Sequence, residues 1–105
     1  MILKIKNVNR LVGVQFWNGI FVFTAAHETD TNYRFQFKDT RSNSLRVVWV
    51  EVSKIGHYNR IEQEWEYILN YPNLKGGTHT VTAKWFEDWQ NVMETFGMAL
   101  KKSIN

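Results

Sequence analysis

Hydrophobic and polar residues alternate with a period of two through most of the first half of the chain, as in strands that bury one face. The first such run is 1–6. The next two runs flank Asn18-Gly19, a residue pair that suits the type I′ turn of a tight hairpin. That turn would place Phe16 opposite Phe21. The predicted core face of this hairpin comprises Val12, Val14, Phe16, Phe21, Phe23 and Ala25.

A second hairpin is predicted from 33–39 and 45–52, with its turn centred on Ser42-Asn43. In this register, apolar residues face apolar residues and opposite charges face each other, and a slip of one residue would lose both agreements. The expected cross-strand pairs are Tyr33 with Val52, Arg34 with Glu51, Phe35 with Val50, Phe37 with Val48, and Asp39 with Arg46.

The segment 60–70 carries two competing patterns. Asn59 and Glu62 resemble a capping box, and apolar residues follow with helical spacing from Ile61. Glutamates at alternate positions indicate a strand instead. We expect a helix here, because glutamate and glutamine favour helices and are depleted in strands.

From about Thr82 the helical pattern is unambiguous. Its apolar stripe consists of Trp85, Trp89, Val92, Met93, Phe96 and Leu100. We therefore predict an α+β fold: a curved antiparallel β-meander of about five strands followed by one or two C-terminal helices. Residues 1–105 are expected to form a single domain, with the sheet at about 1–54 and the helical part at about 60–103.

Composition narrows the class of protein. The 105 residues include no cysteine, which excludes a disulfide framework, thiolate catalysis and cysteine-ligated zinc. The sequence contains no long apolar run of the kind that spans a membrane, and lysines interrupt the first ten residues where a signal peptide would be apolar. We therefore expect a cytoplasmic protein without a membrane partner.

Catalytic residue types are present but not in a diagnostic arrangement. A metal-independent ribonuclease needs a general base, a general acid and a cation for the phosphate. The candidates for these roles are Tyr58, Arg60, Glu64, Glu66 and His79. His27 and Glu28 could approach a metal ion, but adjacent strand residues point to opposite faces. We expect neither a catalytic site, nor a metal site, nor a cofactor, and keep the ribonuclease as a second alternative.

The most informative feature is apolar surface on the predicted sheet's second face, which should be polar if only one face is buried. An apolar surface of this kind is typical of interaction sites. Aromatic anchors with charged residues at the rim suit a protein partner or a second copy of the chain. The candidate partner-binding residues are Trp17, Arg34, Lys38, Val47 and Trp49.

Charge suggests an alternative partner. Residues 1–60 carry nine basic and four acidic side chains, whereas residues 61–105 carry four basic and six acidic ones. A single-stranded nucleic acid could stack bases on a tryptophan while basic side chains contact phosphates. The candidates for this are Lys4, Lys6, Arg34, Lys38, Arg46 and Trp49. We predict a small non-enzymatic protein-binding domain of the inhibitor or adaptor type that can also self-associate, with single-stranded nucleic-acid binding as the alternative.

Overall fold

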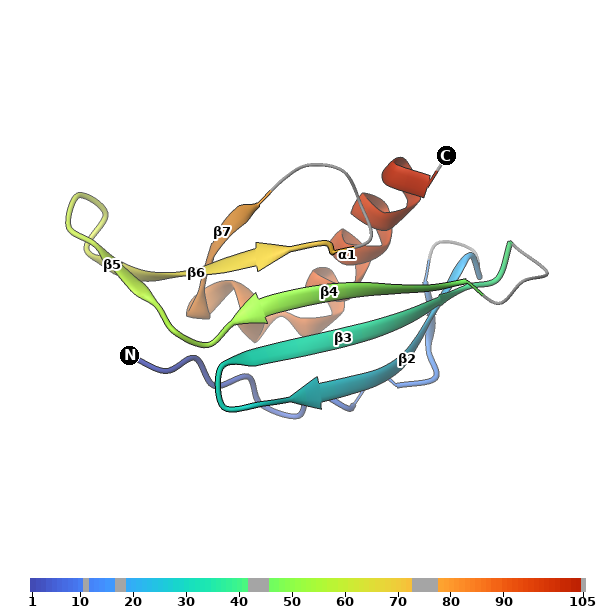
Figure 1. The fold of residues 1–105 in the computed structure, drawn as a ribbon, viewed down its shortest axis with the longest axis horizontal. Coiled ribbons are helices and arrows are strands. Elements are labelled where there is room, and N and C mark those ends of the chain that lie inside the picture. Colours follow the sequence, from blue (N-terminus) through green and yellow to red (C-terminus); the bar gives the residue numbers. More distant parts are fainter. Residues whose placement is uncertain (11, 17–18, 42–45, 73–77, 105) are drawn as a thin grey trace.

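A computed structural model describes residues 1–10, 12–16, 19–41, 46–72 and 78–104. The described chain forms a curved antiparallel sheet followed by a short 3₁₀ helix and one α-helix, so the predicted α+β class is confirmed (Figure 1). The elements are β1 (Gln15–Phe16), β2 (Phe21–Glu28), β3 (Asn32–Asp39), β4 (Val47–Ser53), β5 (His57–Asn59), β6 (Glu64–Asn70), β7 (His79–Thr82), the 3₁₀ helix η1 (Ala83–Glu87) and α1 (Trp89–Ile104).

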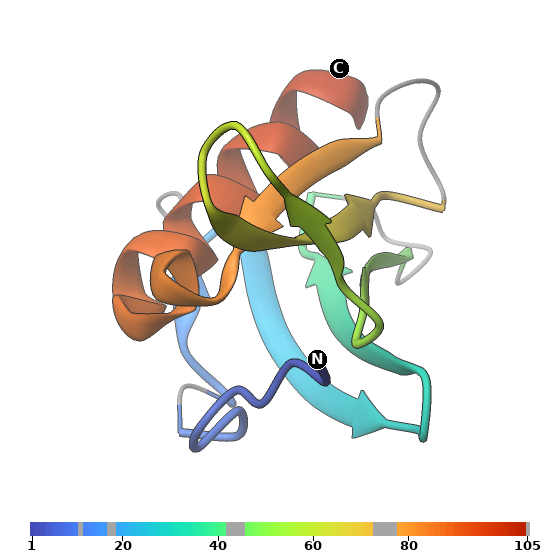
Figure 2. The ribbon, with the colours of Figure 1, turned by 90° about the vertical axis from the view of Figure 1, so that its left-hand side faces the viewer.

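The described residues form a seven-stranded sheet in which neighbouring strands have the order β1-β2-β3-β4-β6-β5, and β7 also pairs with β6. Strands β4 and β5 are two parts of one bent strand, since both pair with β6 in consecutive stretches. The α-helix lies along one side of the curved sheet, next to β7 (Figures 1 and 2). The sheet therefore wraps around one side of α1 and leaves its own outer face uncovered.

The β3–β4 hairpin has the predicted register. Phe35 lies opposite Val50, and the neighbouring aromatic–valine pairs also match. The expected Arg34–Glu51 pair is an ion pair of 3.1 Å. Asp39 differs in part: its backbone N–H donates to the Arg46 carbonyl, but its carboxylate binds the Arg41 guanidinium at 3.2 Å. Ser42-Asn43, the predicted turn, lies outside the described residues.

The first hairpin matches its predicted pairing but not its predicted core face. Phe16 pairs with Phe21 as expected. Val12 and Val14 are 42% and 38% exposed, however, because β1 is only two residues long and the chain before it leaves the sheet.

A bulge in β2 alters the predicted core face at its far end. The pairing with β3 shifts by one residue after Phe23, so that Ala25 lies opposite Gln36. Ala26 takes the place opposite Phe35 and packs against the core instead. A bulge inserts one residue into a strand and moves every later side chain to the other face, which simple alternation does not predict.

The first six residues alternate as predicted but do not form a strand. Their only ladder contact among the described residues is an isolated bridge between Ile2 and Ile55. Leu3 and Ile5 are nevertheless buried, and the Ile5 N–H donates to the Tyr33 hydroxyl at 3.0 Å. The segment thus acts as a strap across the core.

The helix predicted at 60–70 is wrong, and this segment contains strand β6. Tyr67 and Leu69 are buried while their neighbours are not, which is the period-two pattern. The hydrogen bonds expected of a capping asparagine are present, but they stabilise a turn instead of a helix. Asn59 Oδ1 accepts hydrogen bonds from the N–H groups of Ile61 and Glu62 at 3.0 and 3.1 Å. This side-chain turn closes the β5–β6 hairpin, as asparagine can do outside helices. The sheet consequently extends to Thr82 rather than to about residue 54.

Gly56 lies at the bend between β4 and β5. A Cβ atom at this position would stand 2.8 Å from Tyr67 Cε1 and 3.1 Å from Trp65 Cε3. The first distance is shorter than real Cβ contacts and the second is tighter than most of them, so any larger residue would force the β6 rings over this backbone to shift.

Helix α1 fills the concave side of the sheet with aromatic rings. Trp89 is 1% exposed, and its ring lies 5.2 Å from Phe35 and 6.5 Å from Phe23, in edge-on contacts that rings favour. Phe96, about two turns further along the helix, contacts Phe35 and Phe37. The predicted stripe therefore packs as expected at Trp89, Val92, Met93 and Phe96, whereas Trp85 is half-buried on η1, before α1 begins.

Trp89→Ala should lower the free energy of unfolding by about 3–5 kcal/mol, because it removes a buried ring at the centre of this contact. Trp89→Phe, which keeps a ring, should cost less. Chemical denaturation monitored by circular dichroism measures both. Equal midpoints for the wild type and Trp89→Ala would show that α1 does not pack on the sheet.

Candidate functional site

Four of the predicted partner-binding residues meet on the outer face of β3 and β4, the face turned away from α1. We call Arg34, Lys38, Val47 and Trp49 the outer-face patch. The β3–β4 register places Lys38 beside Val47 and Gln36 beside Trp49. Val47 is 36% exposed and Trp49 is half-buried. Trp17, the fifth predicted residue, lies outside the described residues.

Trp49 is held by its neighbours rather than by the core. The Arg34 guanidinium carbon lies 3.9 Å from the centre of the Trp49 ring, a close cation–π contact. Glu51 binds the same guanidinium at 3.1 Å. The His27 ring lies 6.1 Å from the tryptophan ring. The patch is therefore an aromatic residue framed by an ordered arginine and a carboxylate.

The basic residues proposed to bind nucleic acid are divided between two sides of the molecule. Lys4 and Lys6 line a cavity of about 430 Å³ between the N-terminal segment and η1, together with Arg10 and Glu87. This cavity is on the helix side of the sheet, whereas Trp49 is on the outer face. Arg46 is exposed just before β4, and Arg34 is already paired with Glu51.

Two of the residues proposed for a ribonuclease, His79 and Glu66, lie on opposite faces of the sheet. His79 lies opposite Leu69, so its side chain is on the same sheet face as the buried Leu69. Glu66 occupies the other face of β6, where the Asn59 side chain donates to its carboxylate. A general acid–base pair needs both groups within reach of one substrate, and the sheet separates this pair.

His27 and Glu28 also point to opposite faces, as alternation requires. His27 faces Trp49, while Glu28 binds Lys54 Nζ at 3.3 Å. Hydrogen bonds from Tyr33 and Lys54 hold the pKa of the Glu28 carboxyl below its usual value. Within the described part of the chain, no three histidine, aspartate or glutamate side chains cluster as a metal site would require.

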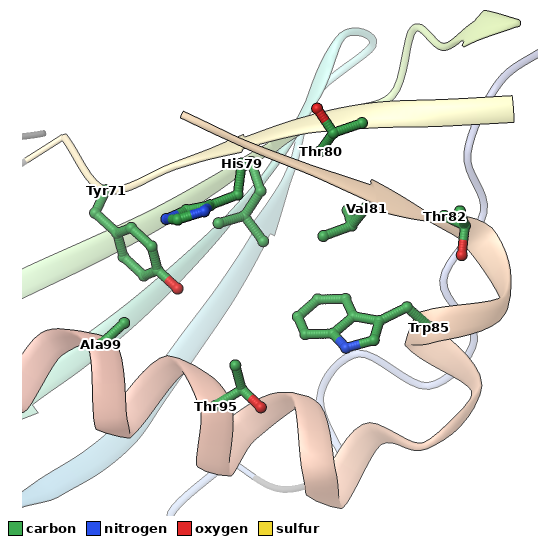
Figure 3. Close-up of a pocket in the computed structure, with 9 residues that line it drawn as sticks. Tyr71, His79, Thr80, Val81, Thr82, Trp85, Thr95 and Ala99 are labelled. Carbon is green, nitrogen blue, oxygen red and sulfur yellow. The ribbon is translucent and has the colours of Figure 1, made fainter. Parts of the chain in front are cut away.

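A groove that the sequence did not indicate lies between β7 and α1 (Figure 3). Its volume of about 470 Å³ falls in the range of ordinary ligand sites. Tyr71 and His79 stand at one end and Trp85 at the other, while Thr95 and Ala99 of the helix face them. The described residues that line it are Leu69, Tyr71, His79, Thr80, Val81, Thr82, Trp85, Thr95 and Ala99.

One signal in the sequence could have indicated this groove. Thr95 and Ala99 are four residues apart, and therefore lie on one face of the helix, adjacent to the aromatic stripe. Small residues beside a stripe of large ones leave space against the facing element. Strand β7, which forms the opposite wall, was not predicted, so the space beside Thr95 and Ala99 could not be recognised as a groove from the sequence.

Comparisons with protein-family models, with curated proteins and with solved structures found no match to this chain. Any function must therefore be inferred from the geometry described above.

The described residues include no helix of the length and apolar character needed to cross a membrane.

Tyr71 is partly buried at one end of the groove. Burial raises the pKa of its phenol from 10.0 to about 12. Because the folded-state pKa is raised, the unfolded chain loses this proton first, and stability should fall as the pH rises from about 10 through about 12.

Tyr71→Phe should reduce this alkaline loss of stability and should remove a late component from an ultraviolet titration of phenolate. Tyr58→Phe, which removes an exposed phenol, is the matched control and should leave that component in place. Burial also raises the pKa of Tyr33, so one late component should persist in Tyr71→Phe. An unchanged titration after Tyr71→Phe would contradict this description of the groove.

Proposed function

We propose that this chain is a non-enzymatic binding protein that recognises another protein through the outer-face patch. The observation that carries the proposal is the position of Trp49 on the outer face of β3 and β4, which are inner strands of the sheet. Exposed faces of antiparallel sheets are normally polar. A tryptophan in this place, with the partly exposed Val47 on the same strand, supplies the apolar centre that protein interfaces use.

The surroundings of Trp49 support the same function. Binding hot spots are typically aromatic or arginine side chains encircled by weaker polar contacts. Here Lys38 and Gln36 are half-buried on the neighbouring strand, and Arg34 is exposed. Arg34 is already ordered by Trp49 and Glu51, so little side-chain entropy would be lost on binding.

A single-stranded nucleic acid is less well supported by this arrangement. Stacking requires an open aromatic face, but the Arg34 guanidinium covers one face of Trp49. The positive charge of Arg34 is offset by Glu51, and two of the other proposed basic residues line the cavity beside η1. Nucleic-acid binding is therefore an outcome for the experiment to detect rather than a second proposal. A cytoplasmic location and self-association stay predictions.

The proposal predicts that Trp49→Ala lowers partner affinity by about 30-fold or more, since truncation of an aromatic anchor costs about 2 kcal/mol. Tagged wild type and variant would be compared by quantitative affinity purification from nuclease-treated lysate, and by light scattering for self-association. Stability should fall only modestly, because Trp49 lies half-buried outside the core and its contact with the exposed Arg34 contributes about 0.5–1 kcal/mol.

Ile61→Ala is the matched control, because Ile61 is a 91% exposed apolar residue on the distant β5–β6 turn. Proteins retained by the wild type and by Ile61→Ala but lost from Trp49→Ala support the proposal. Equal retention by all three proteins would refute it. Retention that depends on omitting nuclease would instead assign the patch to a nucleic acid.

A further inference from the structure

The β7 strand presents an unpaired edge to the groove. Within the described part of the chain, β7 pairs with β6 and with no other strand. In an edge strand, every second residue turns its N–H and C=O away from the neighbouring strand, where an added strand could bind them. Proteins usually protect such edges with charged residues or proline, and His79–Thr82 contains no lysine, arginine, aspartate, glutamate or proline.

The groove runs along this edge. All four residues of β7 line it, although successive side chains of a strand point to opposite faces. Because these residues belong to both faces of the strand, the cavity reaches beyond one face of the sheet to the edge of β7. Figure 3 agrees, since Val81 points toward the helix while Thr80 points away from it.

The chemistry of the groove favours uncharged, apolar side chains. None of its described lining residues is aspartate, glutamate, lysine or arginine. The Thr95 hydroxyl is already used, because it donates to the Asn91 carbonyl at 2.9 Å. Trp85, Tyr71 and Val81 supply apolar walls, and an unpaired charge placed between them would lose its hydration.

We propose that an extended segment of a partner protein adds a strand to β7 and places apolar side chains in the groove. Strand addition satisfies both features at once: the backbone of the added segment pairs with the free edge, and every second side chain enters the space in front of α1. A small apolar molecule would fill the space but leave the edge unpaired. The site is separate from the outer-face patch, which lies on the other side of the sheet, and does not depend on that proposal.

Short random peptides displayed on phage and selected against the immobilised full chain provide the probe. We expect the selected peptides to carry apolar residues at alternate positions. Added to isotopically labelled protein, they should shift the amide signals of His79–Thr82 and the indole signal of Trp85. Two synthetic copies of each peptide would carry backbone N-methyl groups at alternate residues, one copy for each of the two possible registers. The copy methylated at the residues whose N–H groups face β7 cannot donate to that strand and should bind at least about tenfold more weakly.

Two variants test the groove itself. Ala99→Trp should fill the space and weaken the selected peptides at least about tenfold, whereas Ala83→Trp, at an exposed position on η1 outside the groove, should not. Val81→Glu, which introduces a charge into the wall, gives the same test should Ala99→Trp fail to fold.

Failure to enrich any peptide, unchanged affinity in both groove variants, or indifference to both methylation registers would overturn strand addition. Peptides that shift Trp49 rather than β7 would also overturn it, while supporting the outer-face patch.

Discussion

The close approach of the Tyr67 ring to Gly56 is the constraint on which the rest of the structure depends. A flat seven-stranded sheet could not enclose a single helix, so the strand that begins as β4 has to turn before it continues as β5. Glycine permits this turn because any larger residue would occupy the place of the ring. The bend brings β6 and β7 over α1, and the aromatic core around Trp89 then closes beneath them.

The same bend determines which surfaces remain available. Because one helix covers only the concave side, the outer face of β3 and β4 stays uncovered and presents Trp49. Because the sheet formed by the described residues ends at β7, that strand keeps an edge beside α1 that none of them pairs with. Both proposed sites therefore follow from the curvature of the sheet and from its end at β7. The strap formed by the buried Leu3 and Ile5 covers part of the remaining opening.

The sequence predicted local pairing well where several signals agreed. The β3–β4 register followed from alternation together with the Arg34–Glu51 charge match, and both are observed. It failed at β6 because Asn59 forms the same two hydrogen bonds in a turn as it would at the start of a helix. The difference lies in β4 and β7, which pair with β6 but lie outside the segment 59–70, and local propensity contains no information about these pairings.

The outer-face patch was accessible to the same reasoning, because its residues belong to one hairpin whose register could be deduced. The division of the basic residues between two sides of the molecule could not be predicted in this way, since the path of the N-terminal segment depends on contacts with Tyr33 and η1.

The bend between β4 and β5 is tested most directly by a double-mutant cycle on Gly56 and Tyr67. Gly56→Ala should destabilise the wild type by about 1–3 kcal/mol through overpacking, and should cost clearly less when Tyr67→Leu has removed the facing ring. The same cost in both backgrounds would contradict the account, because Gly56 would then owe its place to something other than the ring above it.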